Sequence, residues 1–503
     1  MWKDFILTHV QWPARQAVGT AALSLLIVVP WVNPIATGPS PAVIPLLVSW
    51  LCVAGLFLSG AVPGAGAVSR AWLAAGLLSC VIGLCQYVGV AAWFEPWMNR
   101  AAIGEAFANL RQRNQFATLT NIALAATLWF TTHSRPAGHA KWLALGAACL
   151  LAVGNAASSS RTGLVQLLFL GLLAAVWRGW RRRDVMLILL AAMVAYGLAA
   201  YALPRLAGLD PAVHGIFARV AEGAPICASR ITLWSNVLHL IAQKPWLGWG
   251  WGELDYAHYI TLYPGERFCD ILDNAHNLPL HLAVELGVPA ALLICGGLGW
   301  LVLCARPWRE TDPTRQMAWG VLAMIGLHSL LEYPLWYGPF QVALGLCLVM
   351  LWPQPRADRR GRKPHQGMAQ ARQAGVAVFL IAVCAYAAWD YRRISQIYLP
   401  PAARDAAYRE NTLAKARDSW LFPDQVRFAE LTTTSPTKDN AARIHAMARR
   451  LLHYSPEPRV IEKLIESAVL LGRHDEALAH LARYRAAFPK EHAAWVASTA
   501  RTC

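Results

Sequence analysis

The sequence predicts an all-α polytopic membrane protein with about eleven transmembrane helices. Of its 503 residues, 56% are hydrophobic and only 15% are charged, and the mean hydropathy is +0.36. An ordinary soluble domain carries roughly 25% charged residues. Long apolar runs alternate with short polar breaks along most of the chain. The hydrophobic residues are therefore assigned to several membrane spans.

The spans are read from the apolar runs. A bilayer core about 30 Å thick needs roughly 20 helical residues, with some tolerance for shorter spans. The predicted spans are 17–32, 42–58, 71–90, 116–131, 142–157, 163–177, 185–203, 278–304, 317–331, 335–352 and 374–391. The stretch from Met1 to Gln16 is long and leads into a multi-span pattern. We therefore interpret the first run as an uncleaved span and not as a signal peptide.

Orientation follows from the basic breaks, because Lys and Arg near span ends are retained in the cytoplasm. The basic breaks are 178–184, 306–315, 356–365 and, more weakly, 133–141, with Lys3 and Arg15 before the first span. Eleven alternating spans place all of these inside. The same alternation places outside the breaks 99–115, 158–161, 204–277 and 332–334, and everything after Arg392. Because topology explains most of the +16 charge, no nucleic acid is expected as a partner.

This topology divides the chain into four parts. Residues 1–203 hold the first seven spans, 204–277 form a large periplasmic loop, 278–391 hold the last four spans, and 392–503 form a periplasmic helical domain. Within the last part, residues 460–490 have the pattern of a helix-turn-helix repeat of the tetratricopeptide kind. One weak repeat does not establish an array. We expect a small helical domain that packs near the bundle or helps to present an acceptor.

The cysteines predict neither a metal site nor a disulfide framework. Eight of the eleven lie in or beside apolar runs without ligand spacing, as small core or lipid-facing residues. Cys227 and Cys269 share the large loop and could pair if that loop is periplasmic, whereas Cys503 ends the chain. The sequence leaves this pairing open. Because no Asp-x-Asp pair or His/Cys cluster is present, we expect no metal and no cofactor.

Two arginines lie on the face from which the charge bias should exclude them. Arg113 stands beside Gln112, Asn114 and Gln115, and Arg161 follows three serines. Such an arginine can simply extend to the lipid headgroups. Together with Arg230 of the large loop, however, they predict an anion clamp, because guanidinium groups match phosphate oxygens and stay charged. The three polar neighbours of Arg113 are candidate substrate contacts.

The large loop contains a surface helix and several tryptophans. Residues 229–241 have the amphipathic spacing of a helix at a membrane surface. Trp246, Trp249 and Trp251 follow it and are interpreted as interfacial anchors in contact with membrane lipids. A groove for a lipid or a sugar ring is the alternative interpretation.

His276 and Asn277 end the large loop. A histidine here can be a surface residue that faces headgroups. A neutral imidazole with an ordinary pKa of about 6.5 can also accept a hydroxyl proton near pH 7. Glu332, Tyr333 and Tyr337 occupy another break on the same predicted face. Glu332 either orients the histidine or an arginine, or only solvates a turn.

These motifs resemble the bacterial O-antigen ligase and polymerase superfamily. His276, Asn277 and Gly287 match a ligase signature of His-Asn, nine residues and Gly, although Ala290 replaces the usual Gly, Thr or Tyr. The family's other motifs are matched by residues 158–163 (SSSRTG) and by Arg230, Trp234, Pro245, Gly248 and Gly250. The resemblance covers about residues 100–350. Residues 109–126 and 328–337, and the C-terminal helical domain, are similar to the branch that glycosylates pilin and other periplasmic proteins.

The resemblance implies a protein O-oligosaccharyltransferase of the bacterial inner membrane, with its active site and C-terminal domain facing the periplasm. Its partners would be an undecaprenyl-diphosphate-linked glycan and a pilin-like acceptor protein. The glycan would pass en bloc to a Ser or Thr hydroxyl by metal-independent, inverting displacement. The implied catalytic residues are His276, Arg161 and Arg230. The implied substrate-binding residues are Arg113, Gln112, Asn114, Gln115, Asn277, Glu332, Tyr333 and Tyr337.

Two other classes of function are kept as alternatives. The nearer is an O-antigen ligase, whose acceptor is a lipid A core sugar, or an O-antigen polymerase, whose acceptor is another lipid-linked repeat. The more distant is a lipid or solute transporter, in which the basic residues would select cargo. Transporters more often carry charged residues near the membrane midplane and are built of repeated halves, and this sequence shows neither feature clearly. The sequence does not identify the glycan, the acceptor or the oligomeric state.

Overall fold

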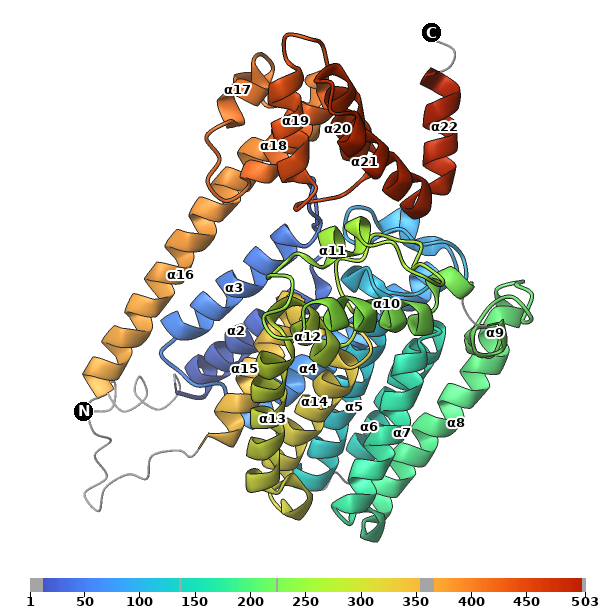
Figure 1. The fold of residues 1–503 in the computed structure, drawn as a ribbon. Coiled ribbons are helices and arrows are strands. Elements are labelled where there is room, and N and C mark those ends of the chain that lie inside the picture. The colour runs from blue at the N-terminus through green and yellow to red at the C-terminus, as the bar shows by residue number, and fades with distance from the viewer. Residues whose placement is uncertain (1–11, 135–137, 223–224, 353–365, 500–503) are drawn as a thin grey trace. The chain divides into compact units, whose positions relative to one another are not determined.

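The computed structural model describes residues 12–134, 138–222, 225–352 and 366–499 (Figure 1). Residues in these ranges form helices, turns and loops, and no strand. The basic break 356–365, Lys3 and Cys503 lie outside the described residues, as do parts of 1–16 and 133–141. Two compact units are present: Met1–Glu222 with Ala305–Ala385, and Gly223–Cys304 with Tyr386–Cys503.

The first unit is a bundle of long helices. Its elements are α2 (Trp12–Val32), α3 (Val43–Leu58), α4 (Ala65–Tyr87), η1 (Val90–Phe94), η2 (Ala108–Leu110), α5 (Arg113–Ser134), α6 (His139–Ala157), α7 (Arg161–Val176), η3 (Gly179–Arg181), α8 (Arg183–Leu206), α9 (Ile216–Glu222), η5 (Pro307–Arg309), α14 (Pro313–Ser329), η6 (Pro334–Trp336), α15 (Gly338–Leu351) and the start of α16 (Gln366–Ser395).

Helix α5 is the centre of this bundle. Every residue from Gln115 to Thr127 is buried, and α4, α6, α7 and α14 pack around the helix. Small residues allow this close packing. A Cβ added to Gly163 of α7 would lie only 2.5 Å from Cβ of Ala117, so no larger residue fits there without movement. Because neighbouring helices cover α5, its threonines and asparagines face protein and not lipid.

Five helical stretches in the described ranges are long and apolar enough to cross a membrane, which supports a membrane protein. They are Ala65–Tyr87, His139–Ala157, Arg183–Leu206, Val288–Arg309 and Gln370–Tyr398. The shorter apolar helices are Gly19–Val32, Val43–Leu58, Arg161–Val176 and Gly338–Leu351. The predicted spans 116–131 and 317–331 fall on the more polar helices α5 and α14. The all-α class is therefore confirmed, and the number of eleven spans stays a prediction.

One predicted span is wrong at its start. Residues 278–304 do not form one helix, because α12 (Leu278–Leu286) ends at Gly287 and α13 (Val288–Ala305) begins after it. Gly287 has a φ of +89°, a left-handed backbone conformation that interrupts an α-helix. Only the α13 portion is long and apolar enough to span.

The second unit combines the large loop with the C-terminal helices. Besides α12, α13 and the end of α16, it contains η4 (Ile226–Ala228), α10 (Arg230–Gln243), α11 (Leu254–Ile260), η7 (Gln396–Tyr398), η8 (Pro401–Ala403), η9 (Ala406–Tyr408), α17 (Thr412–Ala416), α18 (Pro423–Thr433), α19 (Ala441–Leu451), α20 (Pro458–Leu470), α21 (His474–Ala487) and α22 (Pro489–Thr499).

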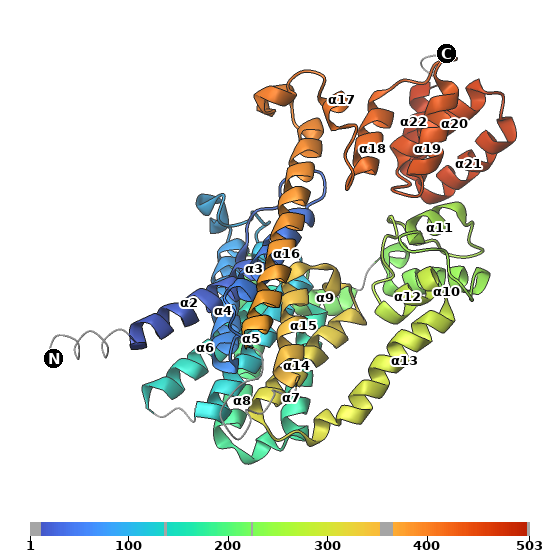
Figure 2. The ribbon, with the colours of Figure 1, turned by 90° about the vertical axis from the view of Figure 1, so that its left-hand side faces the viewer.

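Each C-terminal helix from α18 to α22 packs against the next one in the chain, and Figure 2 shows them gathered in one group. Their apolar faces form a core that also includes Tyr259 of α11, in the large loop. The Tyr259 hydroxyl lies 3.0 Å from His480 Nδ1, and Arg483 donates a 3.0 Å hydrogen bond to the Ile260 carbonyl. The loop and the C-terminal helices therefore share a core, although they are 200 residues apart in the sequence.

Candidate functional site

The start of α5 is held by its own polar residues. Gln112 Oε1 accepts a 2.7 Å hydrogen bond from the Gln115 backbone N–H, so the side chain caps the helix. Such a cap satisfies one of the amide groups that a helix leaves open at its first turn. The Arg111 guanidinium donates to the carbonyls of Asn109 and Pro34. Arg113 and Asn114 are thereby placed on a fixed helical turn.

Asn114 joins three motifs that are far apart in the sequence. Its side-chain oxygen accepts a 2.6 Å hydrogen bond from Ser160 Oγ, and its Nδ2 donates a 3.2 Å bond to Glu332 Oε1. Ser160 also caps α7, because its Oγ accepts from the Gly163 backbone N–H at 2.9 Å. The structure therefore brings together the polar segment at Arg113, the SSSRTG motif and the Glu332 turn.

Three arginines gather beside this junction. Arg161 is the exposed first residue of α7, and Arg113 forms a 3.0 Å ion pair with Glu105. Arg219 of α9 donates a 3.0 Å hydrogen bond to the Ser159 carbonyl. Burial first, and then Arg113 and Arg161, together lower the pKa of Arg219 to about 10, while Glu105 opposes the shift. Two cations and one carboxylate thus act on a guanidinium that still carries its charge at neutral pH.

Sequence reasoning missed Arg219. The residue lies in a stretch without a recognisable motif, and α9 is only seven residues long. One signal was available, because Arg219 belongs to a break that the charge bias assigns to the outer face. The same argument that selected Arg113 and Arg161 therefore applies to it.

A buried polar network continues below the junction. Thr118 Oγ1 lies 3.0 Å from both Gln166 Oε1 and His328 Nδ1. Asn121 and Asn155 each donate to the Gly163 carbonyl, at 3.0 and 3.2 Å. These residues were not predicted, although a polar side chain within an apolar span is itself a signal. The network fixes the first turn of α7, which carries Arg161.

Gln112, Gln115 and Tyr337 line a cavity of about 310 Å³ on another side of the α5 start. Its other walls come from the connection between α2 and α3 and from the first turn of α15. Tyr337 also stacks on Tyr333, with ring centroids 5.8 Å apart. Gln112, Gln115 and Tyr337, predicted as substrate contacts, thus surround one space.

The second unit contains the remaining predicted residues, Arg230, His276 and Asn277. Arg230 is the first residue of α10, which Ser229 caps through a 3.1 Å bond from the Thr232 N–H. Trp234, one turn later, donates a 3.1 Å hydrogen bond from Nε1 to the Ala275 carbonyl. Because positions i and i+4 share a helix face, this bond turns the Arg230 face of α10 toward the His276 segment.

His276 is held in a constrained turn. Its φ is +49°, and its backbone N–H donates a 2.8 Å hydrogen bond to Asn274 Oδ1. The next residue, Asn277, caps α12 by accepting from the Leu280 N–H at 3.1 Å. Burial raises the pKa of Asp273, and the nearby His276 opposes that shift. The imidazole therefore lies on a fixed turn with a carboxyl group close by.

The glycines of the motifs have a structural role. Trp249 and Gly250 donate backbone hydrogen bonds of 2.8 and 3.0 Å to the carbonyls of Val284 and Glu285. Gly248 and Gly287 have φ values of +69° and +89°, and a Cβ on either would collide with the opposite backbone. Residues 245–250 therefore lie directly against the break between α12 and α13, where only glycine fits.

The tryptophans of this segment divide into two kinds. Trp246 and Trp251 are 75% and 62% exposed, as expected of interfacial anchors. Trp249 instead donates to the Leu240 carbonyl at 3.0 Å, and Lys244 Nζ lies 4.0 Å from its ring centre. It packs the segment onto α10.

Cys227 and Cys269 form a disulfide in the structure, with Cα atoms 5.2 Å apart. This separation lies within the usual range for bonded cysteines. The bond closes a loop that contains α10 and α11. No group of three or more His, Cys, Asp or Glu residues in the described ranges is arranged to hold a metal ion.

Comparisons with known families match three segments of the chain. Residues 145–295 match the family described as O-Antigen ligase, and residues 106–130 match Protein glycosylation ligase. Residues 316–502 match Virulence factor membrane-bound polymerase, C-terminal. The first two segments contain Arg113, Arg161, Arg219, Arg230 and His276.

Two curated proteins of Acinetobacter baylyi are also similar. A general O-oligosaccharyltransferase is 25% identical over 297 residues, which cover 56% of this chain and 49% of the relative. A ComP-specific O-oligosaccharyltransferase is 26% identical over 254 residues, which cover 48% and 43%. The chain is homologous to these O-oligosaccharyltransferases. It spans about half the length of the relatives that it matches, and the predicted family resemblance is confirmed.

Proposed function

We propose that this protein is a protein O-oligosaccharyltransferase, a glycosyltransferase that moves a glycan en bloc from undecaprenyl diphosphate to Ser or Thr of a pilin-like protein. The observation that carries the proposal is the group of Arg113, Arg161 and Arg219, in which one carboxylate, Glu105, acts on Arg219. Guanidinium groups held together with so little compensating charge favour a bound anion. A diphosphate carries the charge and the oxygens that they need.

The reaction is a single displacement at the anomeric carbon. The acceptor oxygen bonds to this carbon as the bond from the carbon to the diphosphate oxygen breaks, so the configuration inverts. The bonding electrons leave with the diphosphate, where Arg161, Arg219 and Arg113 stabilise the charge, together with Arg230. His276 takes the proton from the acceptor hydroxyl, an effect on the order of 10²- to 10⁴-fold in rate.

The remaining predicted residues support these groups. Asn114 and Glu332 position Ser160, and so the turn that presents Arg161, through the hydrogen bonds given above. Asn277 holds the His276 turn as the cap of α12. Tyr333 stacks on Tyr337, which lines the cavity beside α5. Gln112 and Gln115 contact the glycan there.

The proposed topology is that of a bacterial inner-membrane protein with eleven spans. The arginine group, the loop 204–277 and the domain 392–503 face the periplasm, and the domain is of the tetratricopeptide kind. Exposed basic residues at the C-terminal end of α7 support this orientation, because such residues stay in the cytoplasm. Proteolysis of sealed inside-out and right-side-out vesicles tests it through cleavage in 392–503.

An acceptor other than a protein is the second candidate. The matches to O-Antigen ligase and to the C-terminal part of a membrane-bound polymerase favour a lipid A core or a lipid-linked repeat. Reconstituted protein with one lipid-linked glycan and three competing acceptors separates these functions. We expect the glycan to be found on pilin. Glycan on the core lipid, or a lengthened lipid-linked glycan, would instead identify a ligase or a polymerase and contradict the proposal.

The site is tested by measuring the rate of glycan transfer for the variants Arg161→Ala and Arg183→Ala. Each arginine is the first residue of a long helix, α7 or α8, so the two changes are structurally matched. We expect kcat to fall about 10²- to 10³-fold for Arg161→Ala, because a charge-stabilising donor is lost. Arg183→Ala should keep wild-type transfer. Equal activity in both variants would contradict the proposal.

A further inference from the structure

We propose that the cavity beside the start of α5 is a subsite for a neutral sugar ring, the ring attached directly to the lipid diphosphate. This inference rests on the proposed function and adds the substrate group that the cavity would hold. The cavity of about 310 Å³ lies between the α2–α3 connection, the start of α5 and the first turn of α15. All three belong to the first unit.

Gln115 points to a ligand. The residue is only 3% exposed and lines the cavity. Its backbone N–H donates to Gln112 Oε1, but its side-chain amide has no hydrogen-bond partner among the described residues. Buried amides in proteins are nearly always hydrogen-bonded, because an unpaired one costs free energy. An amide offers both donors and an acceptor, which is the combination that sugar hydroxyls use.

The composition of the walls favours a neutral, partly apolar ligand. No Asp or Glu is among the described residues that line the cavity, so a cation or metal has no carboxylate to bind. Arg111 also lines it, and its guanidinium donates to the Asn109 and Pro34 carbonyls. Pro41, Pro45 and Pro339 supply rigid apolar surface, and Tyr337 supplies an aromatic ring. A pyranose has carbon-bound hydrogens on its faces and hydroxyls at its edge, so it can use both kinds of wall. Ligand sites commonly combine apolar walls with a few fixed polar groups.

The size of the cavity limits how much of a glycan it holds. Small-molecule pockets are typically about 300–1,000 Å³, so this cavity is at the lower end. It suits one sugar ring with its substituents. The rest of an oligosaccharide would extend beyond it.

The cavity is also in the right place for a sugar bound to a diphosphate. Gln112, which caps α5, and Gln115 both line the cavity, whereas Asn114 and Thr118 lie one turn apart on α5 and do not. Arg113, which belongs to the arginine group, and Asn114 thus stand between the two glutamines in the chain. Because the anomeric carbon is bonded to a phosphate oxygen, the donor needs its anion site and its sugar site side by side. The first turn of α5 separates two such sites.

The test measures how much the sugar contributes to donor binding. The Kd values of undecaprenyl diphosphate and undecaprenyl-diphosphate-linked N-acetylglucosamine are measured with the full chain in nanodiscs. We expect the sugar-bearing lipid to bind about 3- to 10-fold more tightly, the gain expected from one or two hydrogen bonds. Gln115→Leu, and Ala42→Phe, which adds an aromatic ring to the wall formed by the α2–α3 connection, should bring this ratio close to one.

Matched controls keep the result interpretable. Gln243→Leu makes the same change at an exposed glutamine of α10, and Ala61→Phe adds the same ring to an exposed loop. Both should keep the wild-type ratio. If Gln115→Leu does not fold, Ala42→Phe still tests the cavity. An unchanged ratio in the folded cavity variants would overturn the sugar subsite. So would cavity variants that bind the acceptor peptide more weakly but bind both lipids as the wild type does.

Failure of the subsite differs from failure of the proposed function. If wild-type protein binds both lipids, and Arg161→Ala weakens both while the cavity variants alter neither ratio, only the sugar subsite is wrong. If wild-type protein binds neither lipid, the proposed diphosphate donor is wrong, and the subsite is lost with it.

Discussion

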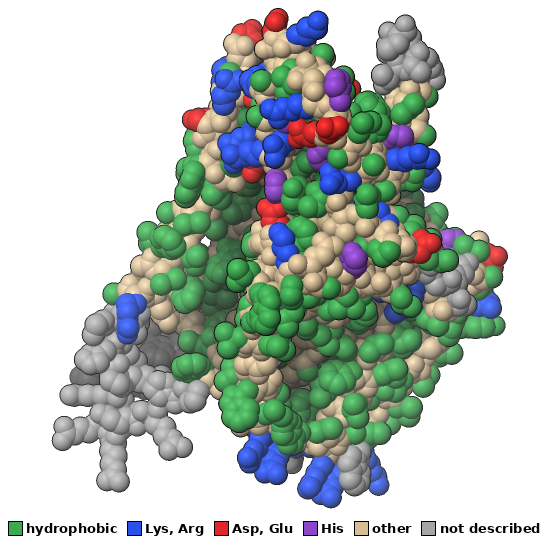
Figure 3. All heavy atoms as spheres, viewed as in Figure 1, with side chains coloured by type: hydrophobic (Ala, Val, Ile, Leu, Met, Phe, Trp, Pro, Cys, Tyr) green, Lys and Arg blue, Asp and Glu red, His purple; other side chains and the backbone are tan. Residues whose placement is uncertain are grey.

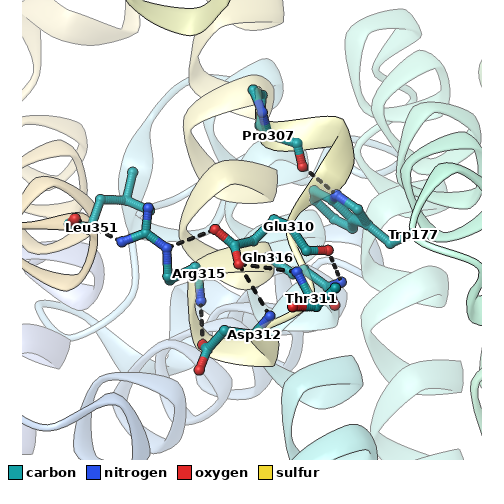
Figure 4. Close-up of polar contacts among 8 residues, drawn as sticks. All are labelled: Trp177, Pro307, Glu310, Thr311, Asp312, Arg315, Gln316 and Leu351. Carbon is teal, nitrogen blue, oxygen red and sulfur yellow. Dashed lines mark hydrogen bonds and ion pairs between the residues drawn. The ribbon is translucent and has the colours of Figure 1, made fainter. Parts of the chain in front are cut away.

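The two ends of the α5 bundle carry their charges in different ways. At the C-terminal end of α7, Glu310 pairs with Arg315 at 2.6 Å, and Arg315 also donates to the Leu351 carbonyl at 2.8 Å (Figure 4). Nearby, Lys141 pairs with Asp184 at 2.7 Å. At the N-terminal end of α7, half-buried Arg219 lies beside Arg113 and Arg161. Local pairing thus stabilises one end, and a cluster of like charges occupies the other.

The difference indicates which end binds a ligand. Lys and Arg gather at the lower end of the view in Figure 3. Arg178, Arg181 and Arg183, between α7 and the start of α8, are exposed. Water solvates such exposed charges, which suits a role in topology. Arg219 is partly desolvated, and Arg113 and Arg161 each repel it more strongly than Glu105 attracts it. A bound anion would therefore stabilise the charged Arg219 side chain more than it would stabilise the exposed arginines at the other end.

The largest effect is expected when the clustered end loses Arg219. Arg219→Ala should lower kcat/KM for transfer about 10²-fold, because a charge-assisted donor is lost next to the diphosphate. Arg182→Ala removes an arginine at the opposite end, where its guanidinium donates to the Thr132 carbonyl. That variant should transfer normally in the same assay. Equal losses in the two variants would remove the distinction between the ends.

A packing change should also act unequally along the bundle. Gly163→Val places new atoms against Asn155 and Ala117, so we expect a loss of about 1–3 kcal/mol in stability. Gly146→Ala, in an open position of α6, should leave stability nearly unchanged. Thermal unfolding in detergent measures both. A tolerated Gly163→Val would show that the tight packing around Arg161 is unnecessary.

Loss of a polar partner should separate function from stability. Asn114→Leu removes two hydrogen bonds of the junction, and Gln316→Leu removes the 2.7 Å bond to the Glu310 carbonyl at the other end. Each change should cost about 1–3 kcal/mol, since buried partners lose their bonds. Only Asn114→Leu should also lower kcat, by roughly tenfold. Unfolding curves and transfer rates are measured on the same preparations.

The smallest effect is expected from a soluble anion. Pyrophosphate at ten times its Kd should stabilise the wild-type protein by about 1.4 kcal/mol, through binding to the folded state alone. This corresponds to a rise of roughly 2 °C in Tm. Sodium chloride at equal ionic strength is the control. The shift should vanish in Arg219→Ala and persist in Arg182→Ala, and a shift in both variants would indicate binding elsewhere.

The sequence predicted the helical class and the segments that meet at the α5 start. Arg113 and Arg161 were selected because the charge bias should exclude arginines from the outer face, and Asn114 and Glu332 because they stand in breaks on that face. Hydrogen bonds now join their segments. The charge bias also assigns Arg219 to the outer face, but no sequence motif surrounds this residue. Its importance depends on a tertiary contact with the Ser159 carbonyl, which no local pattern contains.

Other features were beyond sequence reasoning for physical reasons. The break at Gly287 depends on backbone contacts with residues 245–250, while hydropathy alone continues through it. Thr118, Gln166 and His328 bond only because three helices meet. Cysteine spacing permitted the Cys227–Cys269 bond but could not select it, because pairing requires the folded loop.

The most direct test of the central claim is the affinity for undecaprenyl diphosphate. Its Kd is measured in nanodiscs for wild-type protein, for Arg161→Ala/Arg219→Ala and for Arg182→Ala/Arg183→Ala. We expect the first double variant to bind at least about 10²-fold more weakly, because two charge-assisted contacts are lost, and the second to bind as the wild type does. Equal affinity in both double variants would contradict a diphosphate site at the N-terminal end of α7.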